Sequence, residues 1–370
     1  MNTTRIQNLP AVRLLLSLRT TVACLFLLAV LVLWGTFYQV DHGLYAAQER
    51  FFHSWILLVW GVVPFPGAKL VVAVLSANLM LSILFRFVRD YRLAGLLVVH
   101  LGIALLFASS AFTYYFAEES FVTLAEGGVT SSALSYHDWE LAALSSAHPR
   151  AIDEPDAETV TLAGARSGSR LVLQNENLEV RVLEFHANCE ALGRGSVDSL
   201  VPKRPLAQPA ENIPCLAAEV RALGDAAGST RTVRLHGADP RPAPVVAGGK
   251  VTYLALRRRR IPLPARVRLV DFTRTRHPGT SIAKSFESRL RITGEGIDRE
   301  VAVSMNRPFR HGAFTFFQTS YAETEAGEMS TLAVVKNTGR LLPYIASIAI
   351  ALGMLLHYLF RAMTRKRKKD

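Results

Sequence analysis

The sequence predicts a membrane protein with four transmembrane α-helices and a large β-rich extracytoplasmic domain, similar to a β-sandwich. Half of the 370 residues are apolar, and they gather in a few long blocks, while the middle of the chain has an ordinary composition. Lys and Arg residues cluster beside these blocks. The middle of the chain carries short alternating runs of apolar and polar residues, which are typical of antiparallel strands. These three patterns together indicate the fold class.

Four apolar blocks are candidates for crossing a bilayer, which requires about 20 mostly apolar residues. The predicted helices cover residues 20–40, 70–85, 93–116 and 341–360. They leave a membrane region over 1–116, an extracytoplasmic domain over 117–340, and a basic tail over 361–370 after the fourth helix. The first block contains no charged residue, and the second ends sharply at Arg86.

Basic residues fix the expected orientation, because short loops rich in Lys and Arg stay in the cytoplasm. Three groups precede the first helix, join the second to the third, and follow the fourth: Arg5, Arg13 and Arg19; Arg86, Arg89 and Arg92; Arg361 and 365–369. In a four-span topology all three lie on one side. We therefore expect a bacterial inner-membrane protein with both termini cytoplasmic and a large periplasmic domain. The net charge of +12 lies partly in the tail, so we expect contact with membrane lipids and no nucleic acid.

The loop over 41–69 is apolar but too short to span comfortably. It contains Phe51, Phe52, Trp55, Ile56, Leu57, Leu58 and Trp60. Tryptophan-rich apolar segments favour the headgroup region of a bilayer. We therefore expect this loop to lie on the outer surface of the membrane.

The exported domain shows period-two alternation from Leu171 onward, for example at Val251, Tyr253 and Ala255. Clusters of Pro and Gly at 202–214, 237–249 and 278–279 separate the alternating runs. This pattern predicts antiparallel strands. The polar stretch over 130–168 is expected to be a loop-rich insertion.

Three cysteines are present. Cys24 lies in the first apolar block, where packing is the expected role. Cys189 and Cys215 lie in the exported domain, where a disulfide, two separate buried cysteines or a functional thiol are all open. The sequence has no CxxCH, CxxC, P-loop or HExxH motif, so the chain is not itself a c-type cytochrome, and no catalytic residue is predicted.

Two groups of short motifs stand out. The first comprises Ser17-Leu18-Arg19, Gly35-Thr36-Phe37-Tyr38-Gln39 and His100 in the third helix. The second comprises His277-Pro278-Gly279, Met305-Asn306-Arg307-Pro308, Gly312, 314–318, Tyr321 and Gly353. Together they resemble the ResB family of cytochrome c assembly proteins over roughly half the chain. Tyr38 stands where the family often has Pro, His277 where it often has Tyr, and residues 130–265 carry no resemblance.

The resemblance implies a subunit of a cytochrome c assembly complex. It would help to carry haem b across the membrane and present it for covalent attachment to apocytochrome c. The implied partner is a ResC/CcsA-like membrane protein with a tryptophan-rich haem-handling segment, which this chain lacks, so it would not ligate haem alone. The alternative is a scaffold that binds the partner and apocytochrome without touching haem. The run Arg257–Arg260 is expected to be a solvated loop or strand edge, with contact to an acidic partner or to haem propionates as the alternative.

His100 is the sharpest site candidate. It lies eight residues after Arg92, about 12 Å along the third helix, where a titratable group is costly. Neutral imidazole is a common axial ligand of haem iron, and the resemblance points the same way. Asn78 lies eight residues before Arg86, so we expect it at a similar depth, accepting the second ring N–H of His100. The alternative is an Asn–His hydrogen bond that only packs two helices.

Five other histidines are expected to be surface or hydrogen-bonded residues. They are His42, His53, His277, His311 and His357. The sequence assigns them no role.

The predicted topology can be tested with reporter fusions that are active only in the periplasm. A fusion after Lys369 is expected to be silent and one near Gly248 to be active, because the basic groups hold both termini in the cytoplasm. The reverse pattern of activity would contradict the orientation.

Overall fold

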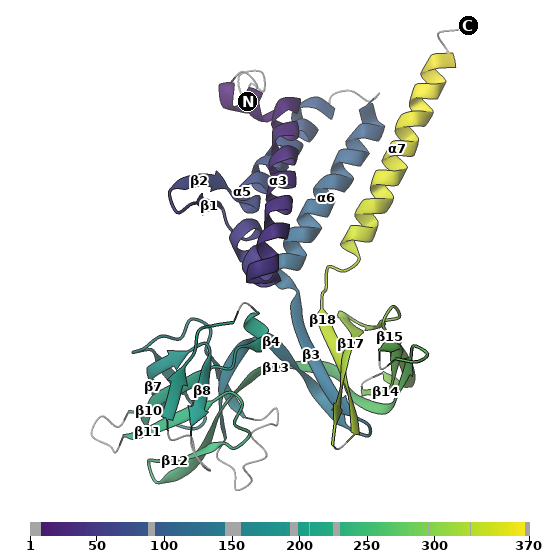
Figure 1. The fold of residues 1–370 in the computed structure, drawn as a ribbon. Coiled ribbons are helices and arrows are strands. Elements are labelled where there is room, and N and C mark those ends of the chain that lie inside the picture. Colours follow the sequence, from purple (N-terminus) through teal and green to yellow (C-terminus); the bar gives the residue numbers. More distant parts are fainter. Residues whose placement is uncertain are drawn as a thin grey trace. The chain divides into compact units, whose positions relative to one another are not determined.

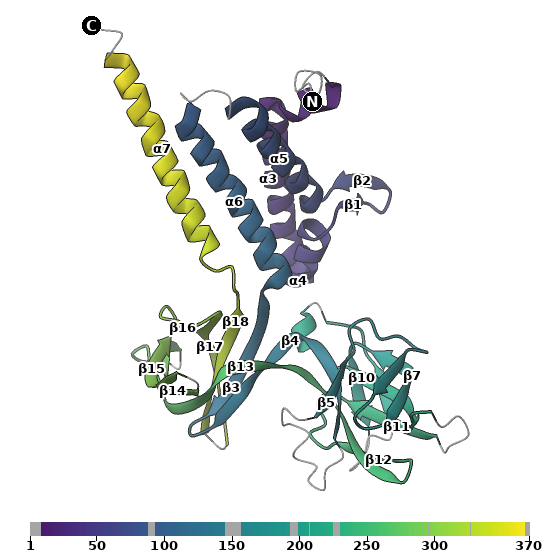
Figure 2. The same ribbon diagram turned by 180° about the vertical axis from the view of Figure 1, so that it is seen from behind.

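A computed structural model describes most of the chain (Figures 1 and 2). It describes residues 9–366 except 88–92, 145–156, 193–198, 207, 225–229, 281, 295 and 326. Two compact units are present. The first, the membrane unit, comprises residues 1–117 and 337–370, and the second, the β unit, comprises residues 118–336.

The membrane unit is helical. Its elements are α2 (Pro10–Leu15), α3 (Leu18–His42), α4 (Leu44–Ala47), the π-turn η1 (Gln48–Phe52), α5 (Ala68–Ser82), the π-turn η2 (Ile83–Phe87), α6 (Ala94–Phe116) and α7 (Leu342–Lys366). Within the described residues, four helices are long and apolar enough to cross a membrane. They are Leu18–His42, Ala68–Phe85, Ala94–Phe116 and Leu342–Met363, which confirms the predicted membrane helices.

Glycines allow α6 and α7 to pack very closely. A Cβ atom added at Gly95 would lie 2.4 Å from the backbone nitrogen of His357, and one at Gly353 would lie 2.7 Å from the backbone nitrogen of Val99. One at Gly102 would lie 2.6 Å from a side-chain carbon of the α7 residue Ile350. Small residues at such crossings let two membrane helices approach backbone to backbone. The α6–α7 pair therefore depends on these three glycines.

The loop between α3 and α5 packs into the helices rather than only lying on a membrane surface. Phe51 is fully buried, with its ring centroid 5.3 Å from those of both Trp34 and Tyr38. After Phe51 the chain forms a two-stranded hairpin of β1 (Ile56–Val59) and β2 (Val63–Pro66). Leu57 of this hairpin is buried in the same cluster.

The β unit is built on a curved antiparallel sheet. The strands along it are β15 (Ile297–Ser304), β14 (Ala283–Gly294), β13 (Lys250–Arg276), β4 (Val129–Leu144), β3 (Glu118–Ala125), β18 (Gly327–Lys336), β17 (Phe314–Thr324) and β16 (Phe309–His311). The sheet curls until β15, near one end, touches β16 and β17 at the other. Its concave side holds one apolar core that includes Val267, Leu290, Phe316 and Leu332.

A second apolar core lies where β4 and β13 extend beyond the curved part of the sheet. Here β5 (Glu158–Thr161) pairs with β4, and β12 (Ala243–Ala247) pairs with β13. A four-stranded sheet packs against them through a shared apolar cluster. Its order is β11 (Arg231–His236), β10 (Cys215–Ala222), β7 (Leu178–His186) and β6 (Arg170–Leu173). The small elements β8 (Cys189–Leu192), β9 (Ser199–Pro202) and η5 (Pro209–Glu211) complete the described part. This half has the predicted sandwich-like packing.

The expectation of a loop-rich insertion over 130–168 is wrong for residues 130–144 and 158–161, which are strands, while residues 162–168 form turns. Residues 129–144 form β4, which pairs with β3, β5 and β13. Ala142 and Ala143 are fully buried, because small side chains fit where several strands crowd together. The Ala- and Ser-rich composition does not favour a strand, so β4 could not be recognised from the sequence; its pairing with neighbouring strands stabilises it.

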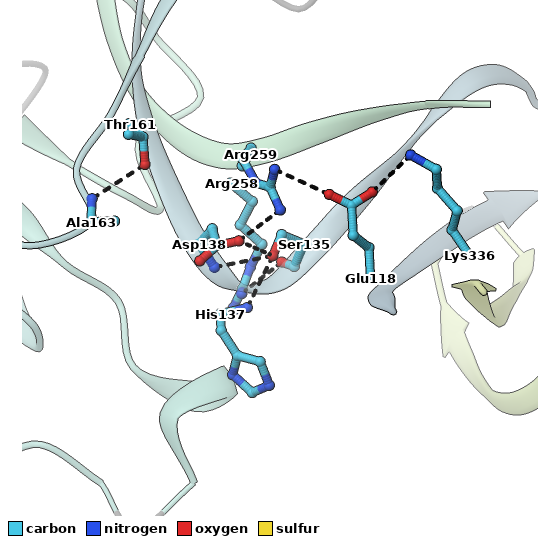
Figure 3. A network of polar contacts seen from close by, with 9 residues as sticks. All are labelled: Glu118, Ser135, His137, Asp138, Thr161, Ala163, Arg258, Arg259 and Lys336. Carbon is cyan, nitrogen blue, oxygen red and sulfur yellow. Dashed lines mark hydrogen bonds and ion pairs between the residues drawn. The ribbon is translucent and has the colours of Figure 1, made fainter. Parts of the chain in front are cut away.

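The arginine run joins β13 to β4 at the point where both strands pass from one core to the other (Figure 3). The Arg258 guanidinium donates to the carbonyls of Ser135, Tyr136 and Ala210, at 3.3, 2.7 and 2.5 Å. It also lies 4.7 Å from the Trp139 ring centroid. Burial lowers the pKa of this guanidinium from its usual high value. Arg258 is thus a half-buried cation held by carbonyls and an aromatic ring.

Arg259 continues the network beside Arg258. It pairs with Asp138 at 2.9 Å and with Glu118 at 3.6 Å, and Glu118 also pairs with Lys336 of β18 at 3.1 Å (Figure 3). The network therefore connects β3, β4, β13 and β18.

The glycine packing predicts that Gly95→Ala destabilises the membrane unit. The added methyl meets the α7 backbone, which cannot move aside as a side chain can, so we expect a loss of about 1–3 kcal/mol. Loss of helical circular dichroism on heating in detergent measures this. Gly35→Ala is the matched control, because its methyl meets side chains rather than backbone: the end of the Phe52 ring at 3.1 Å and the Phe51 ring at 3.8 Å. Equal melting curves for the two variants would contradict the prediction.

The arginine network predicts that Arg258→Lys destabilises the β unit. Lysine keeps the charge but cannot reach three separate carbonyls with a planar fork, so we expect a loss of about 2–4 kcal/mol. Denaturation of the full chain, followed by tryptophan fluorescence after Trp34, Trp55 and Trp60 are replaced by Phe so that only Trp139 emits, measures it. Arg170→Lys is the control, since that side chain is 71% exposed and little change is expected. An effect as small as that of the control would contradict an anchoring role.

Candidate functional site

Three elements of the membrane unit meet around a cavity of about 310 Å³. Its lining residues are Leu16, Leu18, Thr21 and Leu25 from the α2–α3 region, Leu75, Asn78, Leu79 and Ser82 from α5, and His100, Ile103 and Phe107 from α6. Most of this lining is apolar, and of these described residues only His100 has an ionisable side chain. The cavity brings together the two site residues predicted from the sequence, His100 and Asn78.

His100 is positioned by its own helix. Its Nδ1 atom lies 2.7 Å from the carbonyl oxygen of Leu96, one turn earlier in α6. A carbonyl can only accept, so the Nδ1 atom carries the proton and donates it. The neutral ring then has its lone pair on Nε2, which is the atom that would ligate a metal. Hydrogen bonding of one ring nitrogen to a backbone carbonyl is a common way to fix a ligating histidine.

The structure contradicts the predicted hydrogen bond between Asn78 and His100, because Asn78 has other partners. The Asn78 side-chain oxygen accepts from the Thr21 hydroxyl at 2.9 Å, and its amide nitrogen donates to the carbonyls of Leu15 and Ser17. The physical reason is the break between α2 and α3, which leaves the Leu15 carbonyl without a helical donor, while the Ser17 carbonyl also accepts from the Thr20 nitrogen at 3.1 Å. Asn78 is 6% exposed and its polar atoms are all used in this way. It lines the cavity with His100 but does not orient the ring.

Sequence reasoning missed Thr21 and Ser82 as polar groups of this cavity. Nothing in their spacing connects them to His100, because the α2–α3 break that faces them has no strong sequence signal. Ser17 caps the N-terminus of α3 by accepting from the backbone nitrogen of Arg19 at 3.2 Å. This cap is the local feature that could have located the break.

The arginine run lies within strand β13, inside the sheet and paired with β4, so the predicted solvated loop or strand edge is wrong. Arg257 pairs with Glu140 at 2.9 Å, and both side chains are nearly buried. With Arg258 and Arg259 also engaged inside the β unit, these three guanidinium groups serve the domain itself. They do not form an open site for propionates or for an acidic partner.

The two cysteines of the β unit are paired. Cys189 and Cys215 form a disulfide between the start of β8 and the start of β10, with their Cα atoms 6.1 Å apart. Both residues are buried, so of the three possibilities left open the structure shows the disulfide. Cys24 is a buried free cysteine in the apolar cluster of α3 and α5.

The remaining histidines show local contacts. His42 stacks on Tyr38 with ring centroids 3.9 Å apart, and His53 contacts Glu49 at 2.6 Å. His311 lies parallel to the ring of Phe309, and His277 belongs to a turn. His357 lies at the close contact of α7 with Gly95. None of these histidines lines the cavity of His100.

Comparisons with known proteins give two similarities. The model of the ResB-like family matches residues 244–359, which include β13 to β18 and most of α7. Protein NrfI of Wolinella succinogenes is 25% identical over 366 residues, which cover 96% of this chain. The chain spans only 36% of the length of that relative.

The family match covers residues 244–359, whereas the similarity to Protein NrfI covers 96% of the chain and overlaps that region. The family match lies in the part that carries the Met305-Asn306-Arg307-Pro308 motif, and the similarity to Protein NrfI extends through the helices that form the cavity. Both similarities support the resemblance to the ResB family that the sequence motifs indicated.

Proposed function

We propose that this chain is a subunit of a cytochrome c assembly complex in the bacterial inner membrane. It would help to carry haem b across the membrane and present it for attachment to apocytochrome c in the periplasm. The observation that carries the proposal is His100, an imidazole with a fixed tautomer that lines an apolar cavity among membrane helices. An ionisable side chain at such a place is a functional candidate by default.

The cavity suits one face of a haem. Its walls include Leu25, Leu75 and Phe107, which can pack against a flat apolar macrocycle, and His100 supplies a single imidazole for the iron. With Nδ1–H donated to the Leu96 carbonyl, Nε2 would be the atom that binds the iron. Bound haem would bring an iron centre and a reactive porphyrin edge, while the chain's own residues hold and orient it.

The size of the cavity supports a shared site. A volume of about 310 Å³ is at the lower end of small-molecule pockets, which span roughly 300–1,000 Å³. A ligand as large as haem would extend past the helices that surround His100. We propose that the ResC/CcsA-like partner covers the rest of the macrocycle and supplies the second axial ligand.

The partner is also needed for the chemistry. Thioether formation requires reduced haem and the two client thiols to be held close together. Among the described residues, the cysteines of this chain are either buried in the membrane unit or joined in a disulfide, so none of them serves this step as a free exported thiol. The chain's proposed contribution is to position haem, and it is not an autonomous enzyme.

The alternative function is a scaffold that binds the partner and apocytochrome without contacting haem. In that case the Nδ1 hydrogen bond of His100 would serve only to satisfy a polar group in the membrane. The two functions predict different haem contents when His100 is removed.

His100→Ala is expected to remove most of the haem from the purified complex of this chain with its partner. The reason is the loss of one axial ligand, and added imidazole is expected to restore haem binding because the cavity then has room for it. Absorption spectra of the complex with and without imidazole are the measurement. His42→Ala is the matched control, since it removes a histidine of the same unit that does not line the cavity. Full haem content with an unchanged spectrum in the His100 variant would instead support the scaffold.

A further inference from the structure

The β1–β2 hairpin of the membrane unit presents a large apolar surface. From Ser54 to Ala68 the sequence contains no charged residue. Trp60 at the turn is 88% exposed and Val62 is 78% exposed. The other exposed apolar side chains of this segment are Trp55, Ile56, Leu58 and Val63. An apolar patch of this kind on a protein surface marks contact with something other than water.

The hairpin lies beside the membrane helices. It projects sideways from α3 and α5, alongside these helices rather than past their ends (Figures 1 and 2). Its two ends are held together by a hydrogen bond from the Gly67 nitrogen to the Trp55 oxygen at 2.9 Å. Its outer side chains therefore face the surroundings of the helices.

Cationic and aromatic groups surround the base of the hairpin. The Lys69 ammonium lies 5.1 Å from the ring centroid of Tyr114, and the His53 ring contacts the same tyrosine at 4.9 Å. The Arg50 guanidinium lies 5.0 Å from the ring centroid of Tyr38. Aromatic rings mixed with basic side chains are typical of the level where headgroups meet acyl chains. The hairpin thus starts at that level.

Two prolines make the hairpin edge unsuited to pairing with another strand. Pro64 faces Leu58 and Pro66 faces Ile56 in the register of the hairpin. Both lack an N–H group, so a partner strand added along β2 would find no donor at either position. Because these two prolines have no N–H group to leave unpaired, the free-energy cost of placing this strand edge in the bilayer is lower. On the β1 side, the Leu58 carbonyl accepts from the Arg50 guanidinium at 3.5 Å.

The turn holds its tryptophan in an uncommon conformation. Trp60 has φ +50° and Gly61 has φ +76°, and the Val62 nitrogen donates to the Val59 oxygen at 3.2 Å. Left-handed backbone is easy for Gly61 but uncommon for a bulky residue such as Trp60. This conformation places a large amphipathic ring at the tip. Tryptophan is the residue that favours the headgroup boundary most, since its ring is apolar and its N–H is polar.

We propose that the β1–β2 hairpin is a lipid-binding element, with its exposed side chains inserted into the headgroup–acyl boundary of the adjacent leaflet. Its apolar surface, its position beside the helices, the interfacial groups at its base and the proline-blocked edge all fit a lipid surface. The hairpin then anchors the α3–α5 side of the membrane unit laterally in the bilayer. This inference does not depend on haem binding.

Quenching of a probe at the tip by lipid tests the proposal. Trp60→Cys, made in a Cys24→Ala background, is labelled with an environment-sensitive fluorophore, and the full chain is reconstituted into phosphatidylcholine–phosphatidylglycerol vesicles. Bromines on the acyl chains near the headgroups are expected to reduce the emission by about half or more, because the probe contacts those chains. Bromines near the chain ends are expected to quench less.

Matched sites separate lipid contact from other causes. Glu300→Cys, an exposed charged position of the β unit, is expected to be unaffected by brominated lipid, and Leu33→Cys, exposed on α3 within the first span, is expected to be quenched. Val62→Cys provides a second hairpin site if the Trp60 variant does not fold. Water-like emission from both hairpin sites would overturn the proposal. So would emission that is shielded from water yet insensitive to bromine, which would indicate a covering protein.

Discussion

Hydrocarbon offers no water to a polar group, so each polar group in the membrane unit must find its partner within the protein. The described helices mostly meet this constraint locally. Thr36 donates to the Val32 carbonyl and Ser347 donates to the Pro343 carbonyl, each at 2.8 Å and one turn back along its helix. His100 uses the same device with Leu96. A hydroxyl or ring N–H can therefore be accommodated without help from another helix.

Backbone carbonyls at a helix break cannot find a donor within their own helix in this way. Between α2 and α3 the backbone of Ser17 is extended, with ψ +136°, and the Leu15 carbonyl loses its helical donor, while the Ser17 carbonyl accepts from the Thr20 nitrogen at 3.1 Å. A side chain from another helix must supply a donor to the Leu15 carbonyl, and Asn78 of α5 does so, also reaching the Ser17 carbonyl. Thr21 completes the arrangement by donating to the Asn78 oxygen. The helix break thus sets the role of Asn78, and the residues around the break form one wall of the cavity.

How much could be predicted from the sequence follows from the same physics. The four spans were predictable because an unbroken run of about 20 apolar residues is rare outside membrane helices. His100 could be selected as a candidate because an ionisable group in such a span is rare. The spacing from Arg86 and Arg92 indicated a similar depth for Asn78 and His100, and both do line one cavity. Spacing gives depth along a helix, but it does not reveal a competing acceptor on a third helix.

The β unit shows the limits of local pattern more clearly. Strands with strong alternation, such as β13, were recognisable. β4 was not, because its stability comes from pairing with three neighbours rather than from its own side chains. The arginine run resembled a solvated segment since four consecutive cations are usually exposed. Its true setting depends on Glu140, Asp138 and Glu118, whose positions follow only from the strand register.

The proposed haem site depends on the glycine packing between α6 and α7, because α6 carries both the glycines and the residues that line the cavity. One face of α6 presents Gly95, Val99 and Gly102 to α7, and another presents His100, Ile103 and Phe107 to the cavity. A side chain inserted at the first face must move α6, since the α7 backbone lies against it. That movement would carry His100 with it, because its ring is tied to the backbone of the same helix through Leu96. The position and orientation of His100 therefore depend on Gly95 and Gly102, which lie on the opposite face of α6 and have no side chain that could bind a ligand.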